Sequence, residues 1–131
     1  MSFGISTTVA GDFDETVEVT KAALAEQGFG ILTEFDLAAT LKNKLDVDVA
    51  RQVVLGACNP PLAHGALQAE ESIGLLLPCN VVVRAGTDGN VVVEALDPAV
   101  MVQVAQNEKL QGVADDAATR LRAAIEAIGS A

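Results

Sequence analysis

The chain has 131 residues, half of them apolar, and its 18 acidic and 8 basic residues give a formal net charge of -10. A chain of this length forms one domain with its own core and leaves no room for a second. The acidic balance, the sparse Lys42 and Lys44 pair and the restriction of aromatics to four phenylalanines argue against nucleic acid as a partner.

The first predicted elements are a strand and a capped helix. Phe3 to Val9 alternates apolar and polar residues, which predicts a half-buried strand. Asp12 is placed to be the N-cap of a helix, and Glu15 completes a capping-box-like pair with it. Gly28 is placed to end the same helix. The helix between them has an apolar stripe that predicts packing on the fold, formed by Phe13, Val17 and Leu24.

A second strand and a short helix follow. Phe29 to Glu34 is typical of a strand, and Asp36 is placed to cap the helix after it. That helix carries apolar residues at every fourth position, which are Leu37, Leu41 and Leu45. Gln52 to Cys58 is the third predicted strand, and because its Val53-Val54-Leu55 run lacks alternation we expect it to be covered on both faces.

The second half of the chain is predicted to begin with a capped helix and to end with a long helix. Asn59 and Pro60 have cap and first-turn chemistry for a helix to about Glu70. Val81 to Arg84 and Asn90 to Ala95 are two strands, and the Asp-Gly pair in the turn between them favours a hairpin. Asp97-Pro98 starts another short helix. The last helix is predicted after Asn107 from the stripe of Leu110, Ala114, Ala117, Leu121, Ile125 and Ile128.

This order of elements predicts a single α+β domain over residues 1–131, with about five strands. The turn after the first strand has no Gly-x-Gly-x-x-Gly pattern and places Asp12 where a phosphate would bind, which disfavours a nucleotide fold. The most apolar window, Ile73 to Val83, is too short to span a membrane and is interrupted by Pro78. We therefore expect a soluble, cytoplasmic protein with no membrane partner, whose two cysteines are thiols.

Three segments resemble a bacterial and archaeal family known as domain of unknown function 302. They are Gly28 to Glu34, Gly56 to His64 and Ile73 to Val83, with Asp97-Pro98 after the hairpin. The Cys, Asn and Pro residues of the family signature fall on Cys58, Asn59, Pro60, Pro78 and Cys79. The resemblance implies helices packed against a largely antiparallel sheet and a protein that associates with itself, and it implies no established reaction.

Both cysteines, the histidine and three of the four prolines fall between Gly56 and Asn80. Cys58-Asn59 and Cys79-Asn80 resemble two corners of one site, because each pair lies where an apolar run meets a proline. The candidate site is therefore Cys58, Asn59, Pro60, Pro78, Cys79 and Asn80. Because the Pro60 to Pro78 segment can run out as a helix and return, we expect the two cysteines to lie close together.

Each candidate residue has a functional and a structural interpretation. Cys58 precedes a helix whose opening amides would favour a thiolate. Cys79 follows a proline that can be cis. Each cysteine can also be interpreted as a buried thiol in the core. Asn59 and Asn80 could hold a small polar ligand, although Asn59 is explained by capping. His64 falls on the polar face of its helix, so a solvated side chain is expected rather than a metal ligand, and zinc would need further ligands.

Three functions remain open at this point. The first is a homodimeric binding domain that holds a small ligand, a sulfur species or a soft metal ion at Cys58 and Cys79. The second is a redox or sulfur-transfer enzyme with Cys58 as nucleophile and Cys79 as resolving thiol. The third is a structural or interaction protein with both cysteines in its core. The Val-rich hairpin and the apolar excess of so small a chain support the expectation of a homodimer.

Overall fold

The computed structural model describes residues 3–130. It contains five strands, which are β1 (Gly4–Ala10), β2 (Gly30–Asp36), β3 (Gln52–Cys58), β4 (Cys79–Ala85) and β5 (Asn90–Leu96). Its α-helices are α1 (Phe13–Glu26), α2 (Leu37–Leu45), α3 (Pro60–Ala69), α4 (Ala99–Ala105) and α5 (Gln111–Gly129). Short 3-10 turns cover Ile73–Leu76, Thr87–Gly89 and Glu108–Leu110. No helix within residues 3–130 has the length and apolar composition needed to cross a membrane.

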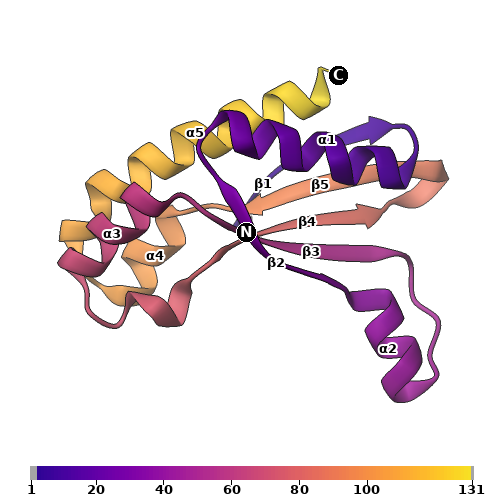
Figure 1. The fold of residues 1–131 in the computed structure, drawn as a ribbon, viewed down its shortest axis with the longest axis horizontal. Coiled ribbons are helices and arrows are strands. Elements are labelled where there is room, and N and C mark those ends of the chain that lie inside the picture. The colour runs from indigo at the N-terminus through magenta and orange to yellow at the C-terminus, as the bar shows by residue number, and fades with distance from the viewer. Residues whose placement is uncertain (1–2, 131) are drawn as a thin grey trace.

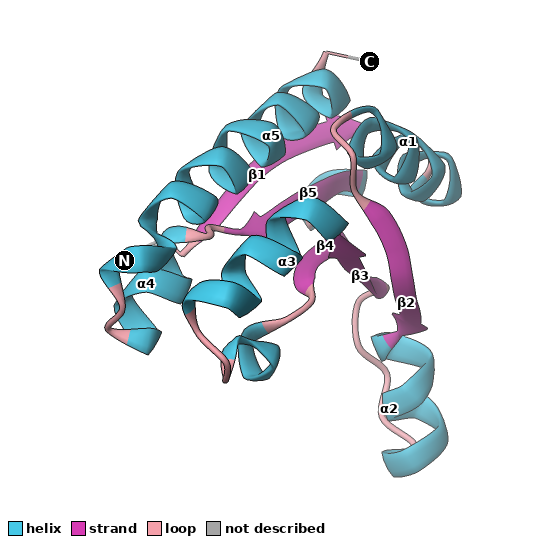
Figure 2. Cartoon of the chain, turned by 60° about the vertical axis from the view of Figure 1, so that its left-hand side comes forward, coloured by secondary structure: helices cyan, strands magenta, loops and turns pink. Residues whose placement is uncertain are grey.

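The five strands form one sheet in the order β1-β5-β4-β3-β2, and every neighbouring pair is antiparallel. Helices α1 and α5 lie over one face of this sheet, while α3 and α4 gather at one end of it (Figure 1). The opposite face has no helix packed along it within the described chain (Figure 2). The α+β prediction with a largely antiparallel sheet is confirmed.

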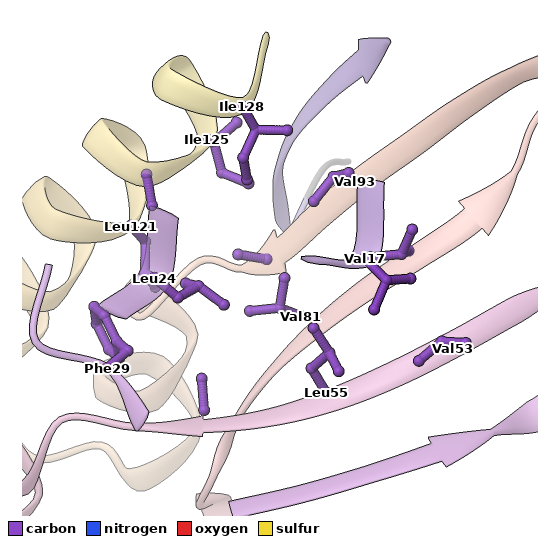
Figure 3. Packing of buried hydrophobic residues seen from close by; sticks show 14 of the residues in the cluster. Val17, Leu24, Phe29, Val53, Leu55, Val81, Val93, Leu121, Ile125 and Ile128 are labelled. Atoms are coloured by element: carbon purple, nitrogen blue, oxygen red, sulfur yellow. The ribbon is translucent and has the colours of Figure 1, made fainter. Parts of the chain in front are cut away.

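The main core lies between the helix-covered face of the sheet and helices α1 and α5. Side chains from both helices and from β3, β4 and β5 interdigitate there, including Leu24, Leu55, Val81, Val93 and Leu121 (Figure 3). All six residues of the predicted stripe on the last helix are buried. A second cluster at the α3 and α4 end joins Ala66, Ile73, Met101 and Leu110.

The helix caps and the turn that the sequence predicts are present in the structure. Asp12 accepts a hydrogen bond from the Glu15 amide at 3.0 Å, and Asp36 accepts one from the Ala39 amide at 2.9 Å. Gly28 ends the first helix with a φ of 84°, a value that glycine adopts without strain. Asp88 and Gly89 both have positive φ at the hairpin turn, as the Asp-Gly signal predicts.

Helix α2 is largely exposed, and strand β3 is covered less than its apolar run predicts. Helix α2 buries none of its residues, and Leu45 is 66% exposed, because α2 projects past the end of β2 away from the other helices (Figures 1 and 2). Strand β3 is covered by helices on one face only. Val53 and Leu55 are buried there, whereas Val54 is half-buried on the open face, between Phe35 and Val82 of the neighbouring strands. These strand neighbours, rather than a helix layer, account for the apolar residue at position 54.

Candidate functional site

The corner between β3 and α3 is fixed by Asn59. Its Oδ1 accepts a hydrogen bond from the Leu62 amide at 3.3 Å, its Nδ2 donates to the Gln27 carbonyl at 3.4 Å, and its side chain is buried. Asn59 thus ties the start of α3 to the end of α1. Both ends of its amide are engaged within the fold, so the capping interpretation of Asn59 accounts for the residue.

The opening amides of α3 differ from the sequence expectation. Pro60 and Pro61, the first two residues of the helix, have no N–H group. The next two amides, of Leu62 and Ala63, are accepted by the side-chain and backbone oxygens of Asn59. The predicted free amides that would stabilise a Cys58 thiolate are therefore already used. Only the weaker field of the helix as a whole favours negative charge at this end.

Cys58 and Cys79 lie close together, as expected. Cys79 pairs with Ala57 across the β3–β4 ladder. Paired Cα atoms are about 5 Å apart and consecutive ones 3.8 Å, so the Cα atoms of the two cysteines lie within about 9 Å. Neither cysteine is in a disulfide. The Leu77-Pro78 peptide bond before Cys79 is cis, as the sequence allowed.

Residues Cys58 and Cys79 both border one small cavity, of about 30 Å³, at the α3 and α4 end of the main core. Its wall includes Cys58, Asn59, Leu62, Cys79 and Met101, with further aliphatic residues and one phenylalanine completing it. Apart from Asn59 and the three sulfur-bearing residues, the lining residues have hydrocarbon side chains. A volume of this size holds about one water molecule or one ion.

The electrostatics of the cavity keep Cys79 protonated. Burial raises the pKa of the Cys79 thiol, because an apolar environment disfavours the thiolate, and the neighbouring charge of Cys58 raises it further. The electrostatic coupling is consistent with the proximity of the two thiols. A thiol of this kind is a poor nucleophile at neutral pH, yet it remains a ligand for an ion that can displace its proton.

Asn80 does not belong to this cavity. It is exposed on the open face of the sheet, where it borders a hollow of about 620 Å³ together with Phe3, Val82 and Glu94. Arg84 donates from Nε to Glu94 Oε1 at 3.0 Å on the same face. The two Cys-Asn pairs are thus not equivalent corners, because Cys79 and Asn80 are consecutive strand residues and point to opposite faces.

The two candidate prolines and His64 have different surroundings. Pro60 is exposed as the first residue of α3, and His64 is exposed on the same helix, as its polar face predicted. Pro78 packs over Gly56 on the open face of the sheet, where an added Cβ at Gly56 would lie 2.8 Å from Pro78 Cγ. Pro78 therefore supports the start of β4 from outside the cavity.

Met101 is the cavity residue that the sequence did not single out. It comes from α4, is 5% exposed, and belongs to the smaller apolar cluster. Its position depends on how α4 folds back against α3, which no local pattern reveals. The one available signal was composition, since Met101 is the sole methionine after Met1. No cluster of three or more His, Cys, Asp or Glu side chains suited to a metal occurs in residues 3–130.

The fold and the cavity define a small α+β domain with an antiparallel sheet and a small pocket, bordered by Cys58, Cys79 and Met101, where the sheet meets α3, α4 and α5. The chain belongs to the family described as Domain of unknown function DUF302, whose sequence model matches residues 5–128. The structure is similar to that of an uncharacterized conserved DUF302 protein from Bacillus stearothermophilus, with a TM-score of 0.89 and 28% identity over 97% of this chain and 98% of that one. No curated protein matches the sequence.

Proposed function

We propose that this protein binds a small soft ligand, a metal ion or a sulfur species, through Cys58 and Cys79. The observation that supports the proposal is that residues Cys58 and Cys79 border one cavity and that the charge of Cys58 raises the pKa of Cys79. Sulfur donors select soft ligands, and thiols in one pocket can bind a single atom together. The volume of about 30 Å³ favours an ion or a single small atom group over an organic molecule.

The same features weigh against the alternative of a thiol enzyme. A catalytic thiol needs a lowered pKa, whereas burial raises the pKa of Cys79. The α3 amides that would activate Cys58 are held by Asn59. A purely structural role for the cysteines predicts instead that neither thiol reacts or binds anything in the folded protein.

Binding of Hg²⁺ tests the proposal, because two thiolates hold this soft ion without further ligands. We expect one Hg²⁺ per chain in native mass spectrometry, with both thiols then protected from iodoacetamide. Cys58→Ser and Cys79→Ser should each remove the protection of the remaining thiol. A wild-type protein that binds no Hg²⁺ while folded, or single variants that bind like the wild type, would refute dithiol binding and favour the structural role.

We further propose that the protein forms a homodimer through α2. The proposal rests on an apolar stripe that its own chain covers only in part, with Leu37 and Leu41 half-buried and Leu45 66% exposed, and on the exposed Val47 and Val49 that follow. Lys42 of α2 pairs with Asp46 at 2.9 Å and with Asp48 at 3.3 Å, so its charge is balanced within the chain. A second copy of this chain, which presents the same apolar stripe, therefore suits α2 in polarity.

Sedimentation at micromolar concentration tests the dimer, with a mass twice the 13.5 kDa of the chain expected. Leu45→Glu should shift the protein to monomer without loss of stability, because the side chain is already exposed in the single chain. Leu67→Glu is the matched control, since Leu67 is 52% exposed but lies on α3 at the other end of the sheet. A wild type that sediments only as monomer, or a dimer insensitive to Leu45→Glu, would rule out this interface.

A further inference from the structure

The open face of the sheet, opposite α1 and α5, contains an apolar row. Phe35, Val54 and Val82 pair across β2, β3 and β4 to form this row, and Phe35 is 48% exposed. Beside Val82, the hollow of about 620 Å³ extends the apolar surface to Leu96 and Phe3. The solvated face of an antiparallel sheet normally carries polar residues, so this surface has the composition of a face that another molecule covers.

The open face also lacks net charge. The charged residues at open-face positions of the five strands are Arg84 and Glu94, which form an ion pair with 3.0 Å between Nε and Oε1. The chain as a whole has a net charge of -10, and α1 on the other face has four acidic residues and one lysine. Two copies can therefore meet through their open faces without the repulsion that two helical faces would produce.

Helix α2 protrudes on the side of the sheet away from α1 and α5 (Figures 1 and 2). Its apolar stripe ends in Leu45, which is 66% exposed, and the exposed Val47 and Val49 follow. Residues 37–49 contain two lysines and two aspartates, so this segment has no net charge either. An uncharged apolar projection and an uncharged apolar hollow thus lie on the same side of the molecule.

We propose that in the homodimer α2 of each protomer docks on the open sheet face of its partner, with Leu45 seated in the hollow beside Val82. This inference rests on the proposed homodimer and names the surface that α2 meets. A two-fold axis makes the two contacts identical, because α2 of the first protomer covers the sheet of the second and the reverse.

The extent of the two surfaces matches what a stable dimer needs. Each strand has seven residues. At about 3.3 Å per residue and about 4.8 Å between strands, the sheet face measures roughly 23 by 24 Å, or about 550 Å². Helix α2, with nine residues at about 1.5 Å each and a width of about 10 Å, adds about 130 Å². A stable interface buries about 800 Å² on each partner, which the sheet face and α2 approach together and α2 alone does not.

Charge substitutions followed by sedimentation at micromolar concentration test the contact. Leu45→Glu and Val82→Lys should each raise the dimer Kd by about tenfold or more, as the loss of a central anchor residue does. The double variant with both substitutions should recover the dimer, because the two introduced charges are opposite and adjacent. Leu45→Glu combined with Val82→Glu is the like-charge control and should stay monomeric. Val19→Glu should leave Kd unchanged, since Val19 is 38% exposed on α1.

Hydroxyl-radical footprinting of the unmutated protein gives a measurement that does not depend on the stability of any variant. Dilution from dimer to monomer should increase the labelling of Phe35 and Leu45 together, while the labelling of Val19 stays constant. Labelling of Leu45 that rises while that of Phe35 does not would overturn the docking of α2 on the sheet.

The outcomes separate this inference from the homodimer itself. A dimer that Leu45→Glu dissociates and Val82→Lys leaves intact overturns the docking on the sheet face, while a dimer through α2 stands. The same holds for a double variant that stays monomeric although its introduced charges are opposite. A wild type that sediments only as a monomer overturns the homodimer and this inference with it. Recovery of the dimer by the opposite charges, and not by the like charges, supports the direct contact.

Discussion

The substitution Gly56→Ala should destabilise the protein, because a side chain at position 56 has no room between β2 and the residue that precedes β4. A Cβ at position 56 would collide with Thr33 Oγ1 on β2 and lie 2.8 Å from Pro78 Cγ ahead of β4. Adding a methyl group to a filled space costs about 1–3 kcal/mol, and the loss of glycine flexibility in the unfolded chain returns about 0.4–1 kcal/mol. The expected net loss is about 1–2 kcal/mol. At about 4 °C per kcal/mol, the melting temperature should fall by roughly 4–8 °C.

Urea unfolding followed by circular dichroism measures this loss, with Gly30→Ala as the matched control. Gly30 lies on β2 in the same sheet, but a Cβ there has no heavy atom within 4 Å, so its free energy of unfolding should not fall. Thr33→Ala combined with Gly56→Ala should recover part of the loss, because Thr33 Oγ1 is the nearer obstacle. A Gly56→Ala protein as stable as Gly30→Ala would refute the argument that Gly56 is required by the approach of Thr33 and Pro78.

Further predictions concern Cys79 and Asn59. Because burial raises the pKa of Cys79, the folded protein keeps this proton when the unfolded thiol, with a pKa near about 8.5, has lost it. The Cys79 contribution to stability should therefore be complete below about pH 8 and decline at higher pH, by at most about 1.4 kcal/mol per pH unit. Cys79→Ala should flatten this decline in urea titrations under reducing conditions between pH 7.5 and 10, and identical pH profiles for the two proteins would contradict it. Asn59→Ala should lower the free energy of unfolding by about 1 kcal/mol or more, because the α3 cap and the bond to Gln27 are lost together. The exposed Asn43→Ala on α2 should change it by less than about 0.5 kcal/mol, and equal losses in the two variants would count against the cap.

Features of the fold that depend on neighbouring residues could be predicted from the sequence. The Asp12 and Asp36 caps, the Gly28 stop and the Asp88-Gly89 turn all form, because each depends on chemistry within a few residues. The family resemblance added the antiparallel sheet. The covering of β3 and the solvent exposure of α2 were not predictable in the same way, since they depend on which elements pack against them.

The candidate site was likewise predictable from the sequence only in part. The proximity of Cys58 and Cys79 was predicted from the out-and-back path between them, and the pairing of Cys79 with Ala57 agrees with it. The separation of Asn80 from Cys79 followed from strand alternation alone and was missed because their flanking sequences look alike. Met101 enters the cavity only through the packing of α4, which has no local signature.

The pairing of β1 with β5 has a consequence for how the chain folds. Gly4 pairs with Leu96, so β1 leaves the ribosome long before β5, its partner in the sheet. The β4–β5 hairpin closes over a short turn and can form in about 1–10 μs, but docking of β1 requires the ordering of everything between. Chains dominated by such distant pairings fold in milliseconds to seconds. Until then Ile5 and Val9 remain available to other nascent chains, which makes the N-terminal strand the segment most dependent on protection during synthesis.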